Sequence, residues 1–202
     1  MQPPTPEEER ARWNRAFTDP AWRNTRFNAQ PNTLLVETVS QLSPGRTLDI
    51  HMGQGRNALY LAQLGWRVTG VDIADQALHL AQQRARQLGL ELTTVETDAS
   101  AYDWGTNQWD LIVLSYADES THVEQATAAL KPGGLVVFEN FHADINQVLQ
   151  GKMGQDIGFA TDELKNCYAE AGFRILRYEE PMGVADFSRE THRLVKLVAQ
   201  KC

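Results

Sequence analysis

The segment LDIHMGQGRNALYLAQLGWRVTGVD, residues 48–72, limits the possible folds more than any other part of the sequence. It starts with an apolar run of strand length and passes through a glycine-rich loop into a stretch with helical periodicity. A second apolar run follows and stops at Asp72. Parallel neighbouring strands need a crossover connection, usually a helix, so this order predicts a βαβ unit.

Strand-like and helix-like segments continue to alternate through residue 141, which implies right-handed crossovers and a parallel sheet. The last two strand-like segments follow each other without a helix, which predicts an antiparallel pair. We therefore expect an α/β fold: a Rossmann-like, doubly wound seven-stranded sheet, mostly parallel with an antiparallel C-terminal strand pair, and helices on both faces. The expected strands are 46–51, 66–72, 91–97, 108–116, 133–141, 173–180 and 191–201, and the expected helices are 5–17, 32–42, 56–65, 75–89, 120–131 and 161–172.

Residues 1–30 precede this pattern as an extension, and 31–202 form the expected domain. A capping threonine, an early proline and glutamates predict the first helix, and the stretch after it is rich in turn-forming residues. We expect the extension to be a lid over the ligand site, or else to pack on the domain as an ordinary extension. Its candidate contact residues are Trp13, Trp22, Arg23, Arg26 and Phe27.

Composition excludes several classes of protein. At 42% hydrophobic residues the 202-residue chain can build a core, yet its apolar runs are far shorter than the roughly 20 residues of a membrane span. The polar, acidic start differs from a secretory signal, and two cysteines make no disulfide framework, so we predict a cytoplasmic protein. A net charge of −7 argues against nucleic acid as a partner. We also predict no membrane association and no metal site.

The glycine loop poses a question about its ligand. Residues 53–58, GQGRNA, fit the dinucleotide fingerprint with alanine in the third glycine's place, and Asp72 lies at the right distance to bind ribose hydroxyls. Asp49 just upstream would repel a pyrophosphate at the helix N-terminus. S-adenosylmethionine has no phosphate but carries an ammonium and a sulfonium, so the acid favours that cofactor.

Residues 31–141 resemble the class I S-adenosylmethionine-dependent methyltransferases, and GRTLDIHMGQGRNALYLAQLGWRVTGVDIADQAL looks most like the small bacterial branch that includes the tellurite-resistance methyltransferases. "PN" before the first core helix and LKPGGLVVFENF at the fifth strand also match. The resemblance implies that the loop holds the methionyl part of the cofactor, with Asp72 on the ribose, Asp98 on the adenine and Ser115 near the methionyl group. The implied cofactor-binding residues are Asp49, His51, Gly53, Gly55, Arg56, Asn57, Asp72, Ile73, Asp98, Ala99 and Ser115.

One departure from the family concerns His51 and Met52, which stand where glycine and a small residue are usual. Glycine is common there because the backbone approaches the cofactor closely and takes a positive φ. We expect a reshaped loop in which His51 turns away or caps the cofactor carboxylate, while Gly53 and Gly55 keep the cradle. The alternatives are a catalytic role for His51, a modified cofactor, or weak binding.

The candidate catalytic residues follow the fourth and fifth strands: Tyr116, Glu139 and His142. Within the same segments Asp118, Glu119, His122 and Asp144 are further candidates. Asp118 and Ser120 are equally suited to cap the next helix, and His122 is expected at its surface. Glu139 lies in an apolar strand, where an unpaired carboxylate costs several kcal/mol, so we expect it to have a partner.

Two further segments are expected to border the site. The glycine-containing stretch 142–158 has the length of a lid or binding loop. Asp186, Arg189 and His192 occupy the region where the tellurite-resistance relatives place a basic stretch beside the substrate, but the two stretches do not match residue for residue.

Together these features predict an S-adenosylmethionine-dependent methyltransferase of a small-molecule nucleophile, because little chain remains beyond the core for a recognition domain. The alternatives are a methyltransferase of a macromolecule that docks through the N-terminus, a cofactor-binding protein without activity, and a nicotinamide-dependent oxidoreductase.

Overall fold

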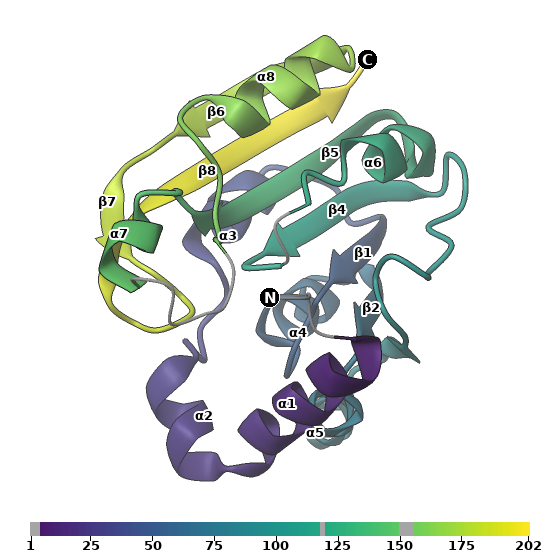
Figure 1. The fold of residues 1–202 in the computed structure, drawn as a ribbon. Helices are drawn as coiled ribbons and strands as arrows, with labels where there is room; N and C mark the ends of the chain where they lie inside the picture. The colour runs from purple at the N-terminus through teal and green to yellow at the C-terminus, as the bar shows by residue number, and fades with distance from the viewer. Residues whose placement is uncertain (1–4, 118–119, 150–155) are drawn as a thin grey trace.

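The computed structural model describes residues 5–117, 120–149 and 156–202. In these residues eight strands form one sheet (Figure 1), of which seven follow the order β3-β2-β1-β4-β5-β8-β6. The predicted fold class is confirmed. A short strand that we did not expect, β7, pairs only with β8. The strands are β1 (Arg46–Ile50), β2 (Arg67–Asp72), β3 (Thr93–Glu96), β4 (Trp109–Ser115), β5 (Leu130–Phe141), β6 (Phe173–Glu179), β7 (Met182–Val184) and β8 (Thr191–Lys201).

The strand directions follow the prediction. β3, β2, β1, β4 and β5 are parallel neighbours, whereas β8 runs antiparallel to both β5 and β6. The chain moves outward from β1 through β2 to β3 and then returns to β4 on the other side of β1. The strand order therefore reverses between β1 and β4, where open α/β sheets bind their ligands.

Helices cover both faces of this sheet. Leu34, Leu61 and Ala81, from three successive helices of the first half, belong to one apolar cluster, and Ala126 and Tyr168 from the second half belong to the cluster on the other face. The helices are α1 (Pro6–Thr18), α2 (Pro20–Arg26), α3 (Thr33–Val39), α4 (Arg56–Gln63), α5 (Asp75–Leu88), α6 (Val123–Ala129), α7 (Ile145–Leu149) and α8 (Glu163–Glu170).

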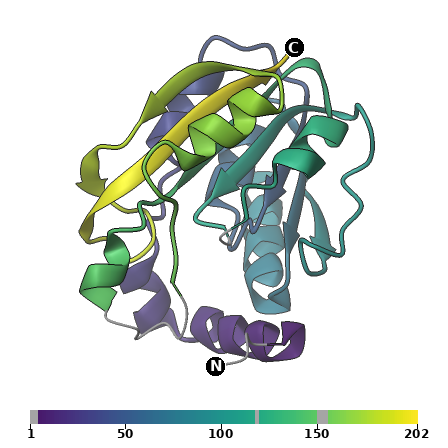
Figure 2. The ribbon, with the colours of Figure 1, turned by 45° about the horizontal axis from the view of Figure 1, so that its top comes forward.

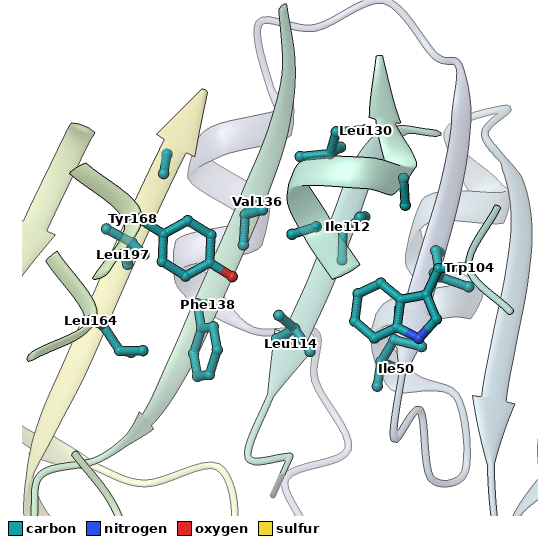
Figure 3. Packing of buried hydrophobic residues seen from close by; sticks show 14 of the residues in the cluster. Ile50, Trp104, Ile112, Leu114, Leu130, Val136, Phe138, Leu164, Tyr168 and Leu197 are labelled. Carbon is teal, nitrogen blue, oxygen red and sulfur yellow. The ribbon is translucent and has the colours of Figure 1, made fainter. Parts of the chain in front are cut away.

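The larger apolar cluster holds the C-terminal half of the sheet together. Figure 3 shows Leu164 and Tyr168 of α8 near Phe138 and Leu197 of the strands below, with Trp104 farther along the same face. Each of the first four side chains is completely buried. The Tyr168 hydroxyl donates to the Thr121 carbonyl oxygen at 2.9 Å, so its polar end is satisfied within the core.

The N-terminal extension is more helical than expected. Residues 20–26 form α2 because Asp19 accepts hydrogen bonds from the amides of Ala21 and Trp22, and Pro20 suits the first helical position. The sequence reading of a turn-rich stretch was wrong here. α1 and α2 lie together at one end of the molecule, with α1 against α5 (Figures 1 and 2).

α1 is fastened to α5 through a cap supplied from outside that helix. Ala74, the residue before α5, has no side-chain cap, but Asn14 of α1 accepts a hydrogen bond from the Gln76 amide at 3.1 Å and donates to Asp75. α1 therefore satisfies backbone groups that α5 leaves open.

None of the helices in the described parts of the chain combines the length and the hydropathy that crossing a membrane requires.

Candidate functional site

A buried carboxylate marks the carboxyl end of β1. Asp49 is 1% exposed, and its Oδ2 atom has no hydrogen-bond partner among the described residues. Burial raises its pKa to about 7, against the opposing charge of Arg56, and the negative Asp72 nearby adds to the rise. An unsatisfied carboxylate oxygen in the interior is costly unless a cation or donor reaches it. Asp49 therefore suits a cationic ligand at the switch point.

The loop after β1 has the backbone conformation of a cradle. His51, Gly53 and Gly55 all have positive φ, at 56°, 56° and 80°. A Cβ at Gly55 would lie 3.0 Å from Ala81 Cβ, so the loop packs tightly on α5. His51 thus takes the left-handed conformation that we expected to favour glycine. The Met52 side chain occupies the space beside Gly70 of β2, where any larger residue would overlap the Met52 sulfur.

Asp72, at the end of β2, ties this loop to the start of α5. Its Oδ2 accepts from the Gly53 amide and its Oδ1 from the Ala74 amide, both at 2.8 Å. Burial raises its pKa, while His51 and these amides oppose the rise. The carboxylate is 8% exposed and each oxygen retains further acceptor capacity, so it fits two hydroxyl donors of a ribose.

The residues implied on the adenine side are only partly free to bind. Asp98 accepts from the Ser100 amide at 2.8 Å and from its hydroxyl at 2.6 Å, which fixes the turn after β3. Ala99 is buried, and Ile73 remains partly exposed. Asn57, also implied, accepts from the Asn32 amide at 2.9 Å and is 3% exposed, so its visible role is to join α4 to α3.

Arg56, the first residue of α4, connects the loop with β4 and the C-terminal hairpin. Its Nη2 donates to Ser115 Oγ at 3.0 Å, and its Nη1 lies 2.5 Å from Asp186 Oδ2. Ser115 is thereby brought to the start of α4, next to the loop. Asp186 lies with these groups, in the turn between β7 and β8.

Two of the three candidate catalytic residues meet directly. The Tyr116 hydroxyl donates to Glu139 Oε1 at 2.8 Å, and Lys196 Nζ of β8 lies 3.1 Å from Glu139 Oε2. Glu139 is 3% exposed, so the expected partner of this carboxylate is present. Burial and the Glu139 charge raise the Tyr116 pKa far above its ordinary value, which keeps the phenol protonated and makes it a hydrogen-bond donor.

The strand register gathers these groups on one face of the sheet. Asp49 lies opposite Val113, Ser115 follows two residues later opposite Glu139, and Glu139 lies opposite Lys196. Side chains of paired residues, and of residues two apart, point to the same face. A polar row thus crosses the carboxyl ends of β1, β4 and β5. Sequence reasoning missed Lys196, whose signal was a lysine within an apolar strand, LVKLV.

His142 is directed toward other groups. Its Nδ1 lies 3.1 Å from the Asp144 amide nitrogen and 3.2 Å from the Asp144 carboxylate, and its Nε2 lies 3.0 Å from Thr161 Oγ1. Glu180 lies 3.9 Å from the same Nε2. His142 therefore joins the segment after β5 to the start of α8, separately from the Tyr116–Glu139 pair.

The expectation for His122 was wrong. It is 3% exposed and its ring lies 5.3 Å from that of Trp104, because its backbone turns with a φ of 49° before α6 and brings the ring inward. Asp118 and Glu119, the neighbouring candidates, lie outside the described residues, as do residues 150–155 of the expected 142–158 lid.

Aromatic side chains of the extension lie over the loop. Phe17 is the nearest: a Cβ at Gly53 would lie 3.5 Å from its ring. The Phe17 ring stacks on Phe27 at 5.1 Å, and Phe27 lies 5.4 Å from Phe187 of the C-terminal hairpin. A groove of about 780 Å³ opens beside this cluster, between α4, α5 and residues 23–31. The extension thus covers the loop after β1 from one side.

Comparison with known proteins shows which proteins this chain is similar to. Residues 47–134 match the model of a methyltransferase domain family. A ubiquinone biosynthesis O-methyltransferase of Shewanella pealeana is 27% identical over 135 residues, 62% of this chain and 57% of that protein. Hemagglutinin 1 of Eikenella corrodens is 30% identical over 80% of this chain and 54% of that protein.

A third relative is known in structure. The "Probable S-adenosyl-L-methionine-dependent methyltransferase TehB" of Haemophilus influenzae is 26% identical over 81% of this chain and 58% of that protein. The crystal structure of TehB from Haemophilus influenzae superposes with a TM-score of 0.72 at 21% identity, over 94% of this chain and 67% of that one. The chain spans a little over half the length of the curated relatives it matches.

These findings confirm the resemblance predicted from the sequence, including its TehB-type branch, and with it the S-adenosylmethionine cofactor class. They favour a methyltransferase over the nicotinamide-dependent alternative.

Proposed function

We propose that this chain, whose residues 47–134 match the model of a methyltransferase domain family, transfers a methyl group from S-adenosylmethionine to a small-molecule nucleophile. The observation that carries the proposal is the unsatisfied Oδ2 of Asp49, a buried carboxylate oxygen at the switch point of the sheet. The ammonium of the cofactor is a cation suited to that atom, whereas a pyrophosphate would be repelled.

The residues present fit the rest of the cofactor as well. Gly53 and Gly55 give the backbone of the loop the positive φ of a cradle. Asp72 would accept from the ribose hydroxyls, while Ile73 and Ala99 offer apolar surface toward the base. The Asp98 carboxylate is already hydrogen-bonded to Ser100. We therefore assign Asp98 to the adenine on the family resemblance alone.

Methyl transfer requires little from the protein beyond positioning the cofactor and the acceptor. A sulfonium carries an already activated methyl group, so in-line orientation and exclusion of water supply most of the acceleration. In this chain Tyr116 would present its hydroxyl to the acceptor, held in place by Glu139, while Lys196 balances the carboxylate charge. Because the hydroxyl proton is already donated to Glu139, we assign Tyr116 the role of orienting the acceptor through its hydroxyl oxygen. It is not a base, because burial and Glu139 keep it protonated.

A small acceptor is favoured by how the site is covered. Phe17 lies over Gly53 of the loop and is backed by the stacked Phe27 ring, so a bulky macromolecule would have to displace them. Two of the relatives carry names of enzymes, and one of these names, ubiquinone biosynthesis O-methyltransferase, refers to the synthesis of a small molecule. A methyltransferase of a macromolecule remains the competing function.

Calorimetry and a transfer assay test this function. The chain should bind S-adenosylmethionine and not NADH. It should also methylate one or more members of a panel of thiols, halides, metalloid oxyanions and phenols. Binding without transfer to any acceptor would leave a cofactor-binding protein without activity. Transfer only to protein or RNA would overturn the small-acceptor proposal.

Truncation tests the lid. Removal of residues 1–28 should leave the sheet folded, because α3 begins at Thr33, yet lower turnover strongly by admitting water to the reacting groups. Melting temperature, cofactor affinity and rate would be measured for both forms. Equal affinity and rate would show that the extension is not a lid.

A further inference from the structure

Asp186 joins four parts of the chain through one carboxylate. Its Oδ1 accepts from Asn28 Nδ2 and its Oδ2 from Asn32 Nδ2, both at 2.8 Å, and Arg56 Nη1 lies 2.5 Å from the same Oδ2. The side chains of Asp186 and Arg56 are only 11% and 13% exposed. Asp186 itself belongs to the C-terminal hairpin, so extension, α3, cofactor loop and hairpin all meet at this group.

The backbone reinforces the connection between the extension and the hairpin. Phe27 and Phe187 form an isolated antiparallel bridge, and the Asn28 amide donates to the Asp186 carbonyl oxygen at 2.8 Å. The two phenyl rings lie 5.4 Å apart. The end of the extension is therefore held both by main-chain bonds and by the Asp186 carboxylate.

Arg56 carries the connection into the cofactor loop. It is the first residue of α4 and directly follows Gly55, whose φ is 80°. Besides the ion pair with Asp186, it donates to Ser115 Oγ at 3.0 Å and to the Gln30 carbonyl oxygen at 3.2 Å. A change in the position of its guanidinium would therefore act on the loop, on the end of β4 and on the extension together.

We propose that Asp186 is a positioning residue that fastens the N-terminal extension over the cofactor loop and orients Arg56 at the start of α4. This inference rests on the proposed function, since the loop is taken to hold the cofactor.

The charge balance supports the assignment. Burial opposes ionisation of Asp186, but the Arg56 charge and the hydrogen bonds from Asn28, Arg56 and Asn32 outweigh burial and hold its pKa below the ordinary value. The carboxylate is thus ionised in the closed arrangement, in which the extension lies over the loop. Removal of its charge leaves a nearly buried guanidinium without its counter-ion, which strongly disfavours that arrangement.

The test compares Asp186→Asn with Glu190→Gln. Glu190 lies in the same hairpin and loses the same charge, but its carboxylate is exposed and its contact with Arg26 is a long one, at 4.0 Å. Acrylamide quenching of tryptophan fluorescence reports the position of the extension, because Trp13 and Trp22 lie in its aromatic cluster. The other tryptophans, Trp66, Trp104 and Trp109, are at most 5% exposed and stay shielded.

At 25 °C, Asp186→Asn should increase the quenchable fluorescence and raise the Kd for S-adenosylmethionine at least fivefold, whereas Glu190→Gln should change neither. Asn28→Ala serves as a second variant, because it removes one donor and leaves the buried charge pair intact. It should shift both measurements in the same direction by a smaller amount, in a protein whose melting temperature is close to that of the unmodified chain.

Unchanged quenching and unchanged Kd in both Asp186→Asn and Asn28→Ala would overturn the proposal. A lower melting temperature without those changes would reduce Asp186 to a purely structural residue and refute it equally. If the unmodified chain binds no S-adenosylmethionine, the proposed function fails, and quenching alone then decides whether Asp186 holds the extension.

Discussion

Replacement of Asp49 by asparagine should stabilise the free protein and weaken cofactor binding at the same time. The substitution keeps the shape of the side chain and removes the buried charge. In the folded chain burial raises the pKa of Asp49 from 3.8 to about 7. Each pKa unit corresponds to about 1.4 kcal/mol, so at pH 8 the ionised carboxylate costs the folded state on the order of 4 kcal/mol.

The pH dependence of this cost has a definite sign. Between about pH 4 and pH 7 the unfolded chain has lost the Asp49 proton while the folded chain retains it. The folded state therefore binds more protons, and this group makes the free energy of unfolding fall as the pH rises through that window. Above pH 7 both states are ionised and its contribution is constant.

Denaturant unfolding of both forms at pH 5 and pH 8 measures the effect. Asp49→Asn should exceed the unmodified chain in unfolding free energy by about 1 to 3 kcal/mol at pH 8, because the amide still leaves an imperfectly bonded polar group. The advantage should shrink at pH 5. Affinity for S-adenosylmethionine should fall by about 10-fold to 100-fold, since a charge-assisted hydrogen bond contributes about 1.5 to 3 kcal/mol. An Asp49→Asn protein with the same pH profile and the same affinity as the unmodified chain would refute this account of the carboxylate.

Three further substitutions test other parts of the site. Asp72→Ala should weaken S-adenosylmethionine binding well over tenfold in calorimetry, because it removes the acceptor for the ribose hydroxyls and the bond that holds the Gly53 amide; unchanged affinity in a folded protein would remove Asp72 from the site. His51→Gly should keep affinity within about tenfold and preserve turnover, since glycine adopts the observed φ of 56° without strain; normal binding without methyl transfer would instead give His51 a chemical role. Lys196→Met should lower the free energy of unfolding by about 3 to 5 kcal/mol, because it leaves the buried Glu139 carboxylate without its counter-ion; a loss below 1 kcal/mol in urea unfolding would show that Lys196 does not stabilise Glu139.

The order of the helices and strands could be predicted because hydrophobic periodicity is read within a single segment and the crossover rules relate consecutive segments. The helix at 20–26 could not be predicted, since its start depends on how Asp19 and Pro20 combine in a stretch whose composition is typical of turns. The inward position of His122 depends on its positive φ and on Trp104, eighteen residues earlier in the chain, and helix periodicity contains no information about either.

The same distinction applies to the site. The positions of Asp49 and Asp72 beside the glycine loop could be predicted because each lies at the carboxyl end of a strand of the βαβ unit. Lys196 reaches Glu139 only through the antiparallel register of β8 on β5, and Asp186 reaches Arg56 from a hairpin 130 residues away. Long-range register of this kind is set by tertiary packing, which a single sequence does not display.

Asn14 of α1 caps the start of α5. We therefore expect undocking of α1 and fraying of the first turn of α5 to occur as one cooperative unit. When α1 leaves its position, the Gln76 amide loses its acceptor, and the first turn of α5 is left with backbone groups that only solvent can satisfy. Fraying of that turn begins at Asp75, three residues beyond Asp72, so undocking of α1 also loosens the segment that supports the acid. We expect undocking of α1 and fraying at the end of β2 to share one free energy of opening, and a ligand held by Asp72 should raise it.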